Sequence, residues 1–439
     1  MKKQLSQSFF SGIATVVTTL SLIMATPAVV LSKGHKPPPP KGQGRPDKIV
    51  LRVDLSQGDP INSINDDYST TTLEAIANIP GAYVVKTQDG SDAQKAAGKM
   101  QKDRRLIFAE VDMLTESVDA NPHRIGAWGM LTPPEYVNQD AVPMLGLPQA
   151  QAITRGAGTI VAILDTGVQL DHPGLAGSLV QGYDFVDDDA VPQDVPNGQD
   201  DNRDGRVDEV FGHGTHVAGI IHLVAPDAKI MPLRVLDADG IGSVIDLAEA
   251  ISYAVQHGAN VINVSLGTST PSALLNNVVD EASSRGVLVV ASAGNLDSEA
   301  EQYPAADDCA VGVTSINAAD ARSPFSSFGK WVDFSAPGEA IYSTFPPNGY
   351  AHWSGTSMAT PFVAGQIALI RSAAPQFSIR DVVKVMQNSA VQIDKLKENK
   401  HEKNRLGIGR IDIGASVQMA ATGRVDQSGP KKIKGGCLR

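Results

Sequence analysis

The rest of the chain is organised around the stretch Gly355-Thr356-Ser357-Met358-Ala359-Thr360-Pro361, and the apolar run 362–370 follows it. A glycine turn here leads into a helix whose apolar side chains predict burial. Ser357 would lie at the N-terminus of this helix, where unpaired backbone N–H groups and the helix dipole favour negative charge. Serine is also common as a plain helix N-cap. The residues elsewhere in the chain distinguish a functional role of Ser357 from a plain N-cap.

The segment 141–421 alternates apolar strands with amphipathic helices. Residues 159–164 form an apolar run that is typical of a strand buried on both faces. The other expected strands are 229–236, 260–266, 287–292 and 310–315, and the expected helices are 243–257, 272–285 and 413–421. This order predicts an α/β fold, doubly wound, with a mainly parallel sheet and helices on both faces. In such sheets the chemistry lies at the carboxyl ends of the strands.

Polar residues follow three of these strands. Asp165 comes directly after 159–164, Ser265-Leu266-Gly267 ends the strand 260–266, and Asn295 follows the strand 287–292. Each has a plain interpretation as a turn residue. The functional interpretation is a carboxylate and an amide donor aimed into one cleft.

Two histidines lie three residues apart in Gly212-His213-Gly214-Thr215-His216. A metal site is one interpretation, but no glutamate follows the first histidine as in the zinc-protease pattern. One histidine acting as a base fits better. Asp165, His213 and Ser357 then supply a carboxylate, an imidazole and a nucleophile, and a serine hydroxyl needs such a base at neutral pH.

The chain resembles the subtilisin-type serine proteases, or subtilases, over roughly 140–420. The matching motifs are VAILDTG (161–167), HGTHVAG (213–219), VSLG (264–267), SAGN (292–295) and GTSMATP (355–361). Their order of acid, base and nucleophile is that of subtilisin. The resemblance implies a secreted serine endopeptidase that hydrolyses peptide bonds through an acyl-enzyme and is made as a self-processing zymogen.

The resemblance also assigns roles to single residues. Asp165 orients the base, His213 is the general base and acid, and Ser357 is the nucleophile. Asn295 and the Ser357 N–H form the oxyanion hole. The substrate-binding residues are Ser265, Leu266, Gly267, Gly240, Ala291, Ser292, Ala293 and Gln302. Because Gln302 carries no charge, we expect a preference for apolar side chains in the main pocket.

The resemblance also implies functions for the remaining segments of the chain. The expected order is a signal peptide (1–28), a Pro-rich linker (29–46), an α+β propeptide (47–115), a linker with the processing site (116–140), the peptidase domain (141–421) and a basic tail (422–439). The propeptide would inhibit the enzyme within the same chain. We expect an extracellular or periplasmic monomer without a permanent membrane anchor, whose partners are protein or peptide substrates.

The charge and the cysteines set further limits. A net charge of −11 argues against a nucleic-acid binder, because phosphate affinity needs a basic face. Cys309 and Cys437 can form one bridge in an oxidising compartment or stay unpaired thiols.

An acidic insert before His213 suggests a structural calcium ion. Asp200, Asn202, Asp204 and Asp208 fall at positions 1, 3, 5 and 9 of the calcium-loop spacing, and Gly205 is at position 6. Arg206 would contribute its carbonyl, and Asp208 or Glu209 would replace the missing glutamate at position 12. A solvated acidic loop is the alternative.

Two other functions remain open at this point. One is a subtilase dedicated to the maturation of a single partner protein. The other is a catalytically silent subtilase fold that only binds. The second is weaker because all the catalytic positions are filled.

Overall fold

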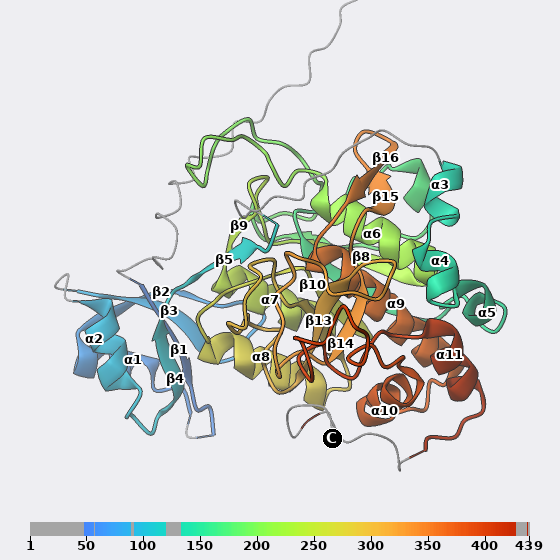
Figure 1. The fold of residues 1–439 in the computed structure, drawn as a ribbon. Coiled ribbons are helices and arrows are strands. Elements are labelled where there is room, and N and C mark those ends of the chain that lie inside the picture. Colours follow the sequence, from blue (N-terminus) through green and yellow to red (C-terminus); the bar gives the residue numbers. More distant parts are fainter. Residues whose placement is uncertain (1–47, 57, 89–91, 120–132, 427–436, 438–439) are drawn as a thin grey trace, which may run out of the picture. The chain divides into compact units, whose positions relative to one another are not determined.

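Seven parallel strands form the central sheet in the computed structural model, which describes residues 48–56, 58–88, 92–119, 133–426 and 437 (Figure 1). Their order is β14-β13-β12-β10-β6-β8-β7. Their bounds are β6 Ile160–Asp165, β7 Tyr183–Asp184, β8 Lys229–Arg234, β10 Val261–Val264, β12 Leu288–Ser292, β13 Ala310–Ile316 and β14 Phe334–Pro337. The predicted doubly wound α/β fold is confirmed.

Helices cover both faces of this sheet because its strands are apolar on both sides. Along β6, Val161 and Ile163 join one apolar core, while Ala162 and Leu164 join the other. The first core contains α6 (His213–Val224), α9 (Thr356–Ala373), α10 (Ile379–Ser389) and α11 (Ile413–Ala421). The second contains α7 (Val244–Gln256) and α8 (Ala273–Ser284).

An α+β subdomain precedes the large sheet. Its four antiparallel strands have the order β2-β3-β1-β4, with β1 Lys48–Val53, β2 Thr70–Ala75, β3 Ala82–Thr87 and β4 Leu106–Val111. α1 (Ile61–Tyr68) and α2 (Ala93–Met100) pack on one face of this sheet. The sequence did not predict α1 and β2, because α1 is polar apart from a few residues and β2 is a largely exposed edge strand.

The other face of the four-stranded sheet packs on α7 and α8 (Figure 1). The Glu110 carboxylate accepts hydrogen bonds from the backbone N–H of Ala273 (2.7 Å) and Leu274 (3.1 Å). These N–H groups belong to the first turn of α8 and have no partner within the helix, so a carboxylate is favoured there. Arg52 also pairs with Glu281 of α8 at 2.7 Å.

Three short strands make a separate small sheet in the order β11-β5-β9. They are β5 (Leu114–Ser117), β9 (Ile241–Ser243) and β11 (Leu266–Gly267). The remaining elements are η1 (Pro173–Leu175), the hairpin β15 (Ile341–Phe345) and β16 (Gly349–Trp353), and the short helices α3 (Pro133–Val137), α4 (Ala141–Met144) and α5 (Leu147–Gln151). Part of the predicted linker 116–140 therefore has regular structure.

Several predicted segments lie outside the described residues. They are the signal peptide 1–28, the Pro-rich linker 29–46, residues 120–132 and most of the basic tail. Within the part of the chain that is described, no helix has both the length and the apolar character needed to cross a membrane.

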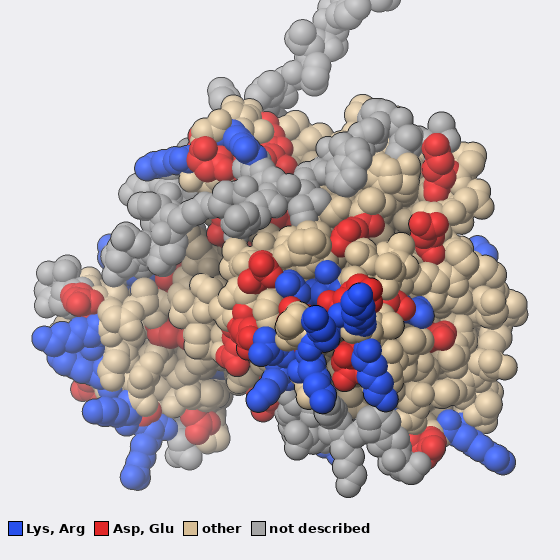
Figure 2. Space-filling view, in the orientation of Figure 1, with Lys and Arg blue, Asp and Glu red and all other residues tan. Residues whose placement is uncertain are grey.

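Charged side chains of both signs are mixed on the face of the molecule shown in Figure 2. Ion pairs in the carboxyl-terminal half have the same character. Arg322 pairs with Asp297 at 2.7 Å, and Arg405 pairs with Glu299 at 2.6 Å. At these two positions an arginine is therefore neutralised by a neighbouring carboxylate.

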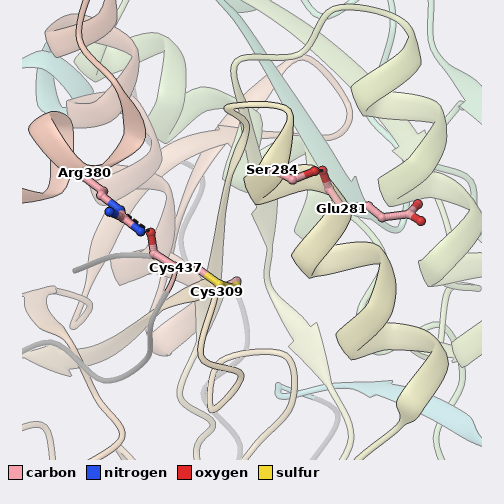
Figure 3. The surroundings of a disulfide bond; sticks show 5 residues. All are labelled: Glu281, Ser284, Cys309, Arg380 and Cys437. Carbon is pink, nitrogen blue, oxygen red and sulfur yellow. Dashed lines mark hydrogen bonds between the residues drawn. A yellow bond between two sulfur atoms is a disulfide. The ribbon is translucent and has the colours of Figure 1, made fainter.

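A disulfide joins Cys309 to Cys437, which decides between the two states that the sequence left open (Figure 3). Cys309 is buried just before β13, and Cys437 packs against both apolar cores of the large sheet. Arg380 Nε donates a hydrogen bond to the Cys437 carbonyl oxygen at 3.3 Å. The bond thus fixes a residue of the carboxyl-terminal tail to the large domain.

Replacing both cysteines by serine should lower the free energy of unfolding by about 2–5 kcal/mol, because the unfolded chain loses a crosslink across a long loop. Thermal unfolding measures the change. A reductant should lower the melting temperature of the unmodified protein and leave that of the double variant unchanged. Equal melting temperatures for the two proteins without reductant would contradict a stabilising bridge.

Candidate active site

Asp165 and His213 are hydrogen-bonded at the edge where the parallel strands end. Asp165 is the last residue of β6, and His213 is the first residue of α6. The Asp165 Oδ1 atom lies 2.7 Å from His213 Nδ1 and also accepts from the Thr166 N–H at 2.8 Å. Both side chains are buried. This contact holds Nδ1 as the donor and directs Nε2 to the opposite side of the ring.

Close packing fixes the position of His213. A Cβ atom on Gly214 would lie 2.0 Å from the Gly167 carbonyl oxygen, so only glycine allows α6 to start this near the end of β6. The Trp353 ring and the imidazole pack in an edge-to-face arrangement, with ring centroids 5.1 Å apart and an interplanar angle of 81°. The imidazole is therefore held by packing as well as by its hydrogen bonds.

Ser357 lies in the first turn of α9, after the N-cap Gly355. Its Oγ donates to the Ser265 carbonyl oxygen at 3.3 Å, and Ser265 Oγ donates in return to the Ser357 carbonyl oxygen at 3.2 Å. Among the described residues, no hydrogen bond joins Ser357 Oγ to His213. The serine is at the predicted helix N-terminus, but its hydroxyl is directed toward the end of β10.

Asn295 is held with its amide N–H₂ group directed into the groove. Its Oδ1 accepts hydrogen bonds from the N–H (2.9 Å) and from Oγ1 (3.0 Å) of Thr356. Nδ2 then donates to the Val118 carbonyl oxygen at 3.2 Å. Thr356 is a positioning residue that the sequence did not single out.

A segment of the chain itself lies in the groove as an added strand. β5 pairs antiparallel with β9 on one side and with β11 on the other. Glu116 lies opposite Gly267, Ser117 lies opposite Leu266, and the Ser117 N–H donates to the Gly240 carbonyl oxygen at 2.7 Å. The predicted groove residues on both walls therefore bind an extended backbone through main-chain hydrogen bonds.

The residues predicted for the main pocket are buried behind this strand. Ala291 and Ser292 end β12 and Ala293 follows them, all with no exposed surface. Gln302 lies close enough to Gly267 that a Cβ there would be 3.2 Å from Gln302 Cγ. The Tyr303-Pro304 peptide bond, which follows Gln302, is cis.

Asp119 is the site residue that the sequence did not identify. Its Oδ2 lies 2.7 Å from His213 Nε2, and its Oδ1 accepts from Asn295 Nδ2 at 2.5 Å. Burial alone would lower the pKa of His213, but the Asp165 and Asp119 carboxylates outweigh it and raise the pKa to about 10. The imidazole is therefore a cation near neutral pH and donates to both carboxylates.

His216 differs from His213 in its hydrogen bonds, although both rings pack against Trp353. Its Nε2 lies 3.1 Å from the Ile341 carbonyl oxygen and 3.0 Å from that of Ala351. Burial lowers its pKa to about 3, so the ring is neutral and donates from Nε2. This histidine ties α6 to the β15–β16 hairpin.

Three side chains of the predicted calcium site, those of Asp200, Asn202 and Asp204, lie close together in the acidic loop. Asp200 Oδ1 and Asn202 Oδ1 both accept from the Asp204 N–H at 3.0 Å. Asp204 Oδ1 accepts from the Arg206 N–H, also at 3.0 Å. The three side-chain oxygens thus all accept hydrogen bonds from backbone N–H groups of the same turn.

Asp208 also belongs to the predicted calcium set, and its carboxylate contacts an earlier part of the loop. It has a left-handed backbone (φ 53°), and its carboxylate accepts from the N–H groups of Asn197 and Gly198. Glu209 lies nearer, with Oε1 at 3.3 Å from Asn202 Nδ2. In the described part of the chain, the loop has no three carboxylates with ligand atoms within 4.8 Å of one another.

Comparison with known proteins relates this chain to the subtilases. A family model described as "Subtilase family" matches residues 156–409. Thermitase from Thermoactinomyces vulgaris is 43% identical over 256 residues, which cover 56% of this chain and 86% of thermitase. Subtilisin BL from Lederbergia lenta is 40% identical over 274 residues, which cover 60% of this chain and 92% of that protein.

Solved structures agree in fold. Fervidolysin from Fervidobacterium pennivorans superposes with a TM-score of 0.68 at 23% identity, over 88% of this chain and 62% of that one. A protease from Pseudoalteromonas arctica gives a TM-score of 0.59 at 28% identity, over 65% of this chain and 98% of that one.

Replacing Gly214 by alanine should destabilise the protein by about 1–3 kcal/mol, because the new methyl group must displace α6 from the end of β6. Gly98→Ala in α2 is the matched control. Nothing lies within 4 Å of a Cβ at Gly98, so this change should be neutral or stabilise by about 0.5–1 kcal/mol. Thermal unfolding compares the two, and equal effects would contradict the close approach.

Proposed function

Because the chain belongs to the subtilase family and is a subtilisin-type serine protease, we propose that Asp165, His213 and Ser357 form its catalytic triad. The observation that carries this proposal is the added strand β5, which leads the Val118 carbonyl to Asn295 Nδ2 at 3.2 Å beside the start of α9. A peptide substrate bound in the same register would present its carbonyl to the same amide. The reaction is hydrolysis of a peptide bond.

In the proposed mechanism, neutral His213 accepts the proton of Ser357 Oγ as the oxygen attacks the substrate carbonyl carbon. The negative charge on the carbonyl oxygen is stabilised by Asn295 Nδ2 and by the N–H groups at the start of α9. His213 then gives the proton to the leaving amine, and water repeats the steps on the acyl-enzyme. Asp165 keeps the imidazole in the required tautomer through the 2.7 Å contact.

Protein and peptide substrates are supported by the way the groove binds backbone. The main-chain hydrogen bonds made with Gly240 and with β11 do not depend on the side chains of the bound peptide. Selection among substrate side chains is therefore left to the main pocket. Val118, a buried apolar residue, precedes the bond at the centre of the site. We therefore propose a preference for apolar residues at this position.

We also propose that the subdomain 47–115 is a propeptide and that the enzyme processes itself. Support comes from its packing on α7 and α8 together with the strand β5 in the groove. Residues that follow the cut would begin the mature chain. Export rests on the charged and apolar order at the start of the sequence, and the monomeric state stays a prediction.

Calcium in the acidic loop is a further proposal, with Asp200, Asn202, Asp204 and the Arg206 carbonyl as the oxygen donors. Asp208 or Glu209 would complete the set, and Glu209 Oε1 lies 3.3 Å from Asn202 Nδ2. Such an ion would supply positive charge that compensates the loop carboxylates and would have a structural role only.

Ser357→Ala should abolish hydrolysis of a protein substrate and leave the chain at full length, because the change removes the hydroxyl proposed as the nucleophile. The expected loss of turnover is about a millionfold, a magnitude that belongs to subtilisin itself and is not obtained from this chain. Ser284→Ala, on the exposed surface of α8, is the control and should change neither result. A shortened Ser357→Ala chain in a protease-free preparation would refute self-processing.

Removing calcium with a chelator should lower the melting temperature, because an ion bound only by the folded state stabilises by about 2.7 kcal/mol at 100 times its dissociation constant. The comparison protein carries Asp200→Asn and Asp204→Asn, and its melting temperature should not respond to the chelator. If both proteins respond equally, the calcium is bound elsewhere. If neither responds, the loop is only a solvated acidic segment.

A further inference from the structure

The register of β5 determines which peptide bond lies at the reacting centre. Thr115 lies opposite Gly242, Glu116 opposite Gly267 and Ser117 opposite Leu266. The next carbonyl, that of Val118, accepts from Asn295 Nδ2 at 3.2 Å. The bond after that carbonyl joins Val118 to Asp119. Among the described residues, the strand thus places the Val118–Asp119 bond beside Asn295 and the start of α9.

The side chain of Asp119 occupies two groups that the reaction needs. One carboxylate oxygen contacts His213 Nε2 at 2.7 Å, and the other accepts from Asn295 Nδ2 at 2.5 Å. Only 1% of this side chain is exposed. A Cβ on Gly355 would lie 2.4 Å from Asp119 Oδ1, so the missing side chain of Gly355 makes the room for this carboxylate.

We propose that Val118–Asp119 is the bond that the enzyme cuts in its own chain, and that the Asp119 carboxylate delays this cut by occupying His213 and Asn295. The proposal rests on the self-processing activity proposed above. It assigns to Asp119 a regulatory role, in which the residue just after the cut inhibits the cut.

The reaction requires this contact to open. His213 must first release to solvent the proton that it shares with Asp119, and Nε2 must face Ser357 Oγ. The serine oxygen then bonds to the Val118 carbonyl carbon and its proton passes to Nε2. The bond from Val118 to the Asp119 nitrogen breaks, and this nitrogen takes the proton. Water then releases Val118 as a carboxylate and restores the Ser357 hydroxyl.

The contacts of Ser357 fit a delayed state. Its Oγ donates to the Ser265 carbonyl oxygen and not to the imidazole, whose Nε2 is already paired with Asp119. The Asp119 carboxylate also contributes to the raised pKa of His213, and a protonated imidazole cannot accept the serine proton. The position of the Ser357 hydroxyl and the charge on His213 therefore both oppose cleavage. Cleavage removes the inhibitor, because Asp119 becomes a mobile chain end.

The test follows conversion of the full chain with time by intact mass and by amino-terminal sequencing of the product. The unmodified chain should give a product that begins at Asp119. Asp119→Asn keeps the shape and removes the charge, and Asp119→Ala removes both contacts. Since a charge at this distance shifts a pKa by about 1–3 units, we expect both variants to process about tenfold faster or more.

Glu74→Gln is the matched control, a carboxylate-to-amide change on the exposed part of β2 in the same subdomain, and it should process at the unmodified rate. A second readout uses the Ser357→Ala chain, which stays intact. In it, nuclear magnetic resonance of His213 should report a lower pKa once Asp119→Asn is added. A purely structural role of Asp119 would leave this pKa unchanged.

The possible outcomes separate the two proposals. Processing that occurs in the Ser357→Ala chain would refute the proposed function. Processing that needs Ser357 but begins at another residue would overturn the assignment of the bond. Correct cleavage at Asp119, with neither variant faster than the Glu74→Gln control, would overturn the inhibitory role.

Discussion

The common edge at which the parallel strands end is the constraint on which the site depends. β6, β10 and β12 run in the same direction, so the residues that follow them gather at one edge of the sheet. Asp165, Ser265 and Asn295 all occupy such positions. The two central helices α6 and α9 begin at the same edge, and each brings one reactive side chain within its first turn. The sheet thus assembles groups that are almost 200 residues apart in the sequence.

Burial makes these contacts strong and selective. Asp165, His213 and Ser357 have no exposed surface, so each polar atom depends on its protein partners and not on water. Thr356 illustrates the effect, since its two hydrogen bonds leave Asn295 only one useful orientation. Because the site is buried away from water, one extra carboxylate, that of Asp119, contributes strongly to the raised pKa of the His213 imidazole.

The sequence was informative where a residue's role follows from its own strand or motif. The buried strands of the large sheet, the positions of Asp165, His213 and Asn295, and the helix start at Ser357 are examples. β5 escaped prediction because its four residues lack a strand pattern and acquire partners only from β9 and β11. Asp119 has no local signal at all, since its role depends on the register of that strand. Spacing alone also does not reveal the left-handed backbone of Asp208 or the contacts of its carboxylate with Asn197 and Gly198.

The disulfide has a consequence for a chain that is cut in one of its later loops. Cys309 and Cys437 close a covalent ring of the chain that contains Ser357 and all of α9. A single nick by a neighbouring molecule anywhere within this ring leaves both fragments linked. Asp165, His213 and Asn295 lie on the part of the chain before Cys309, so such a nicked molecule keeps its nucleophile tethered to its base. Autolytic damage in the last third of the chain therefore does not by itself separate the two halves of the active site.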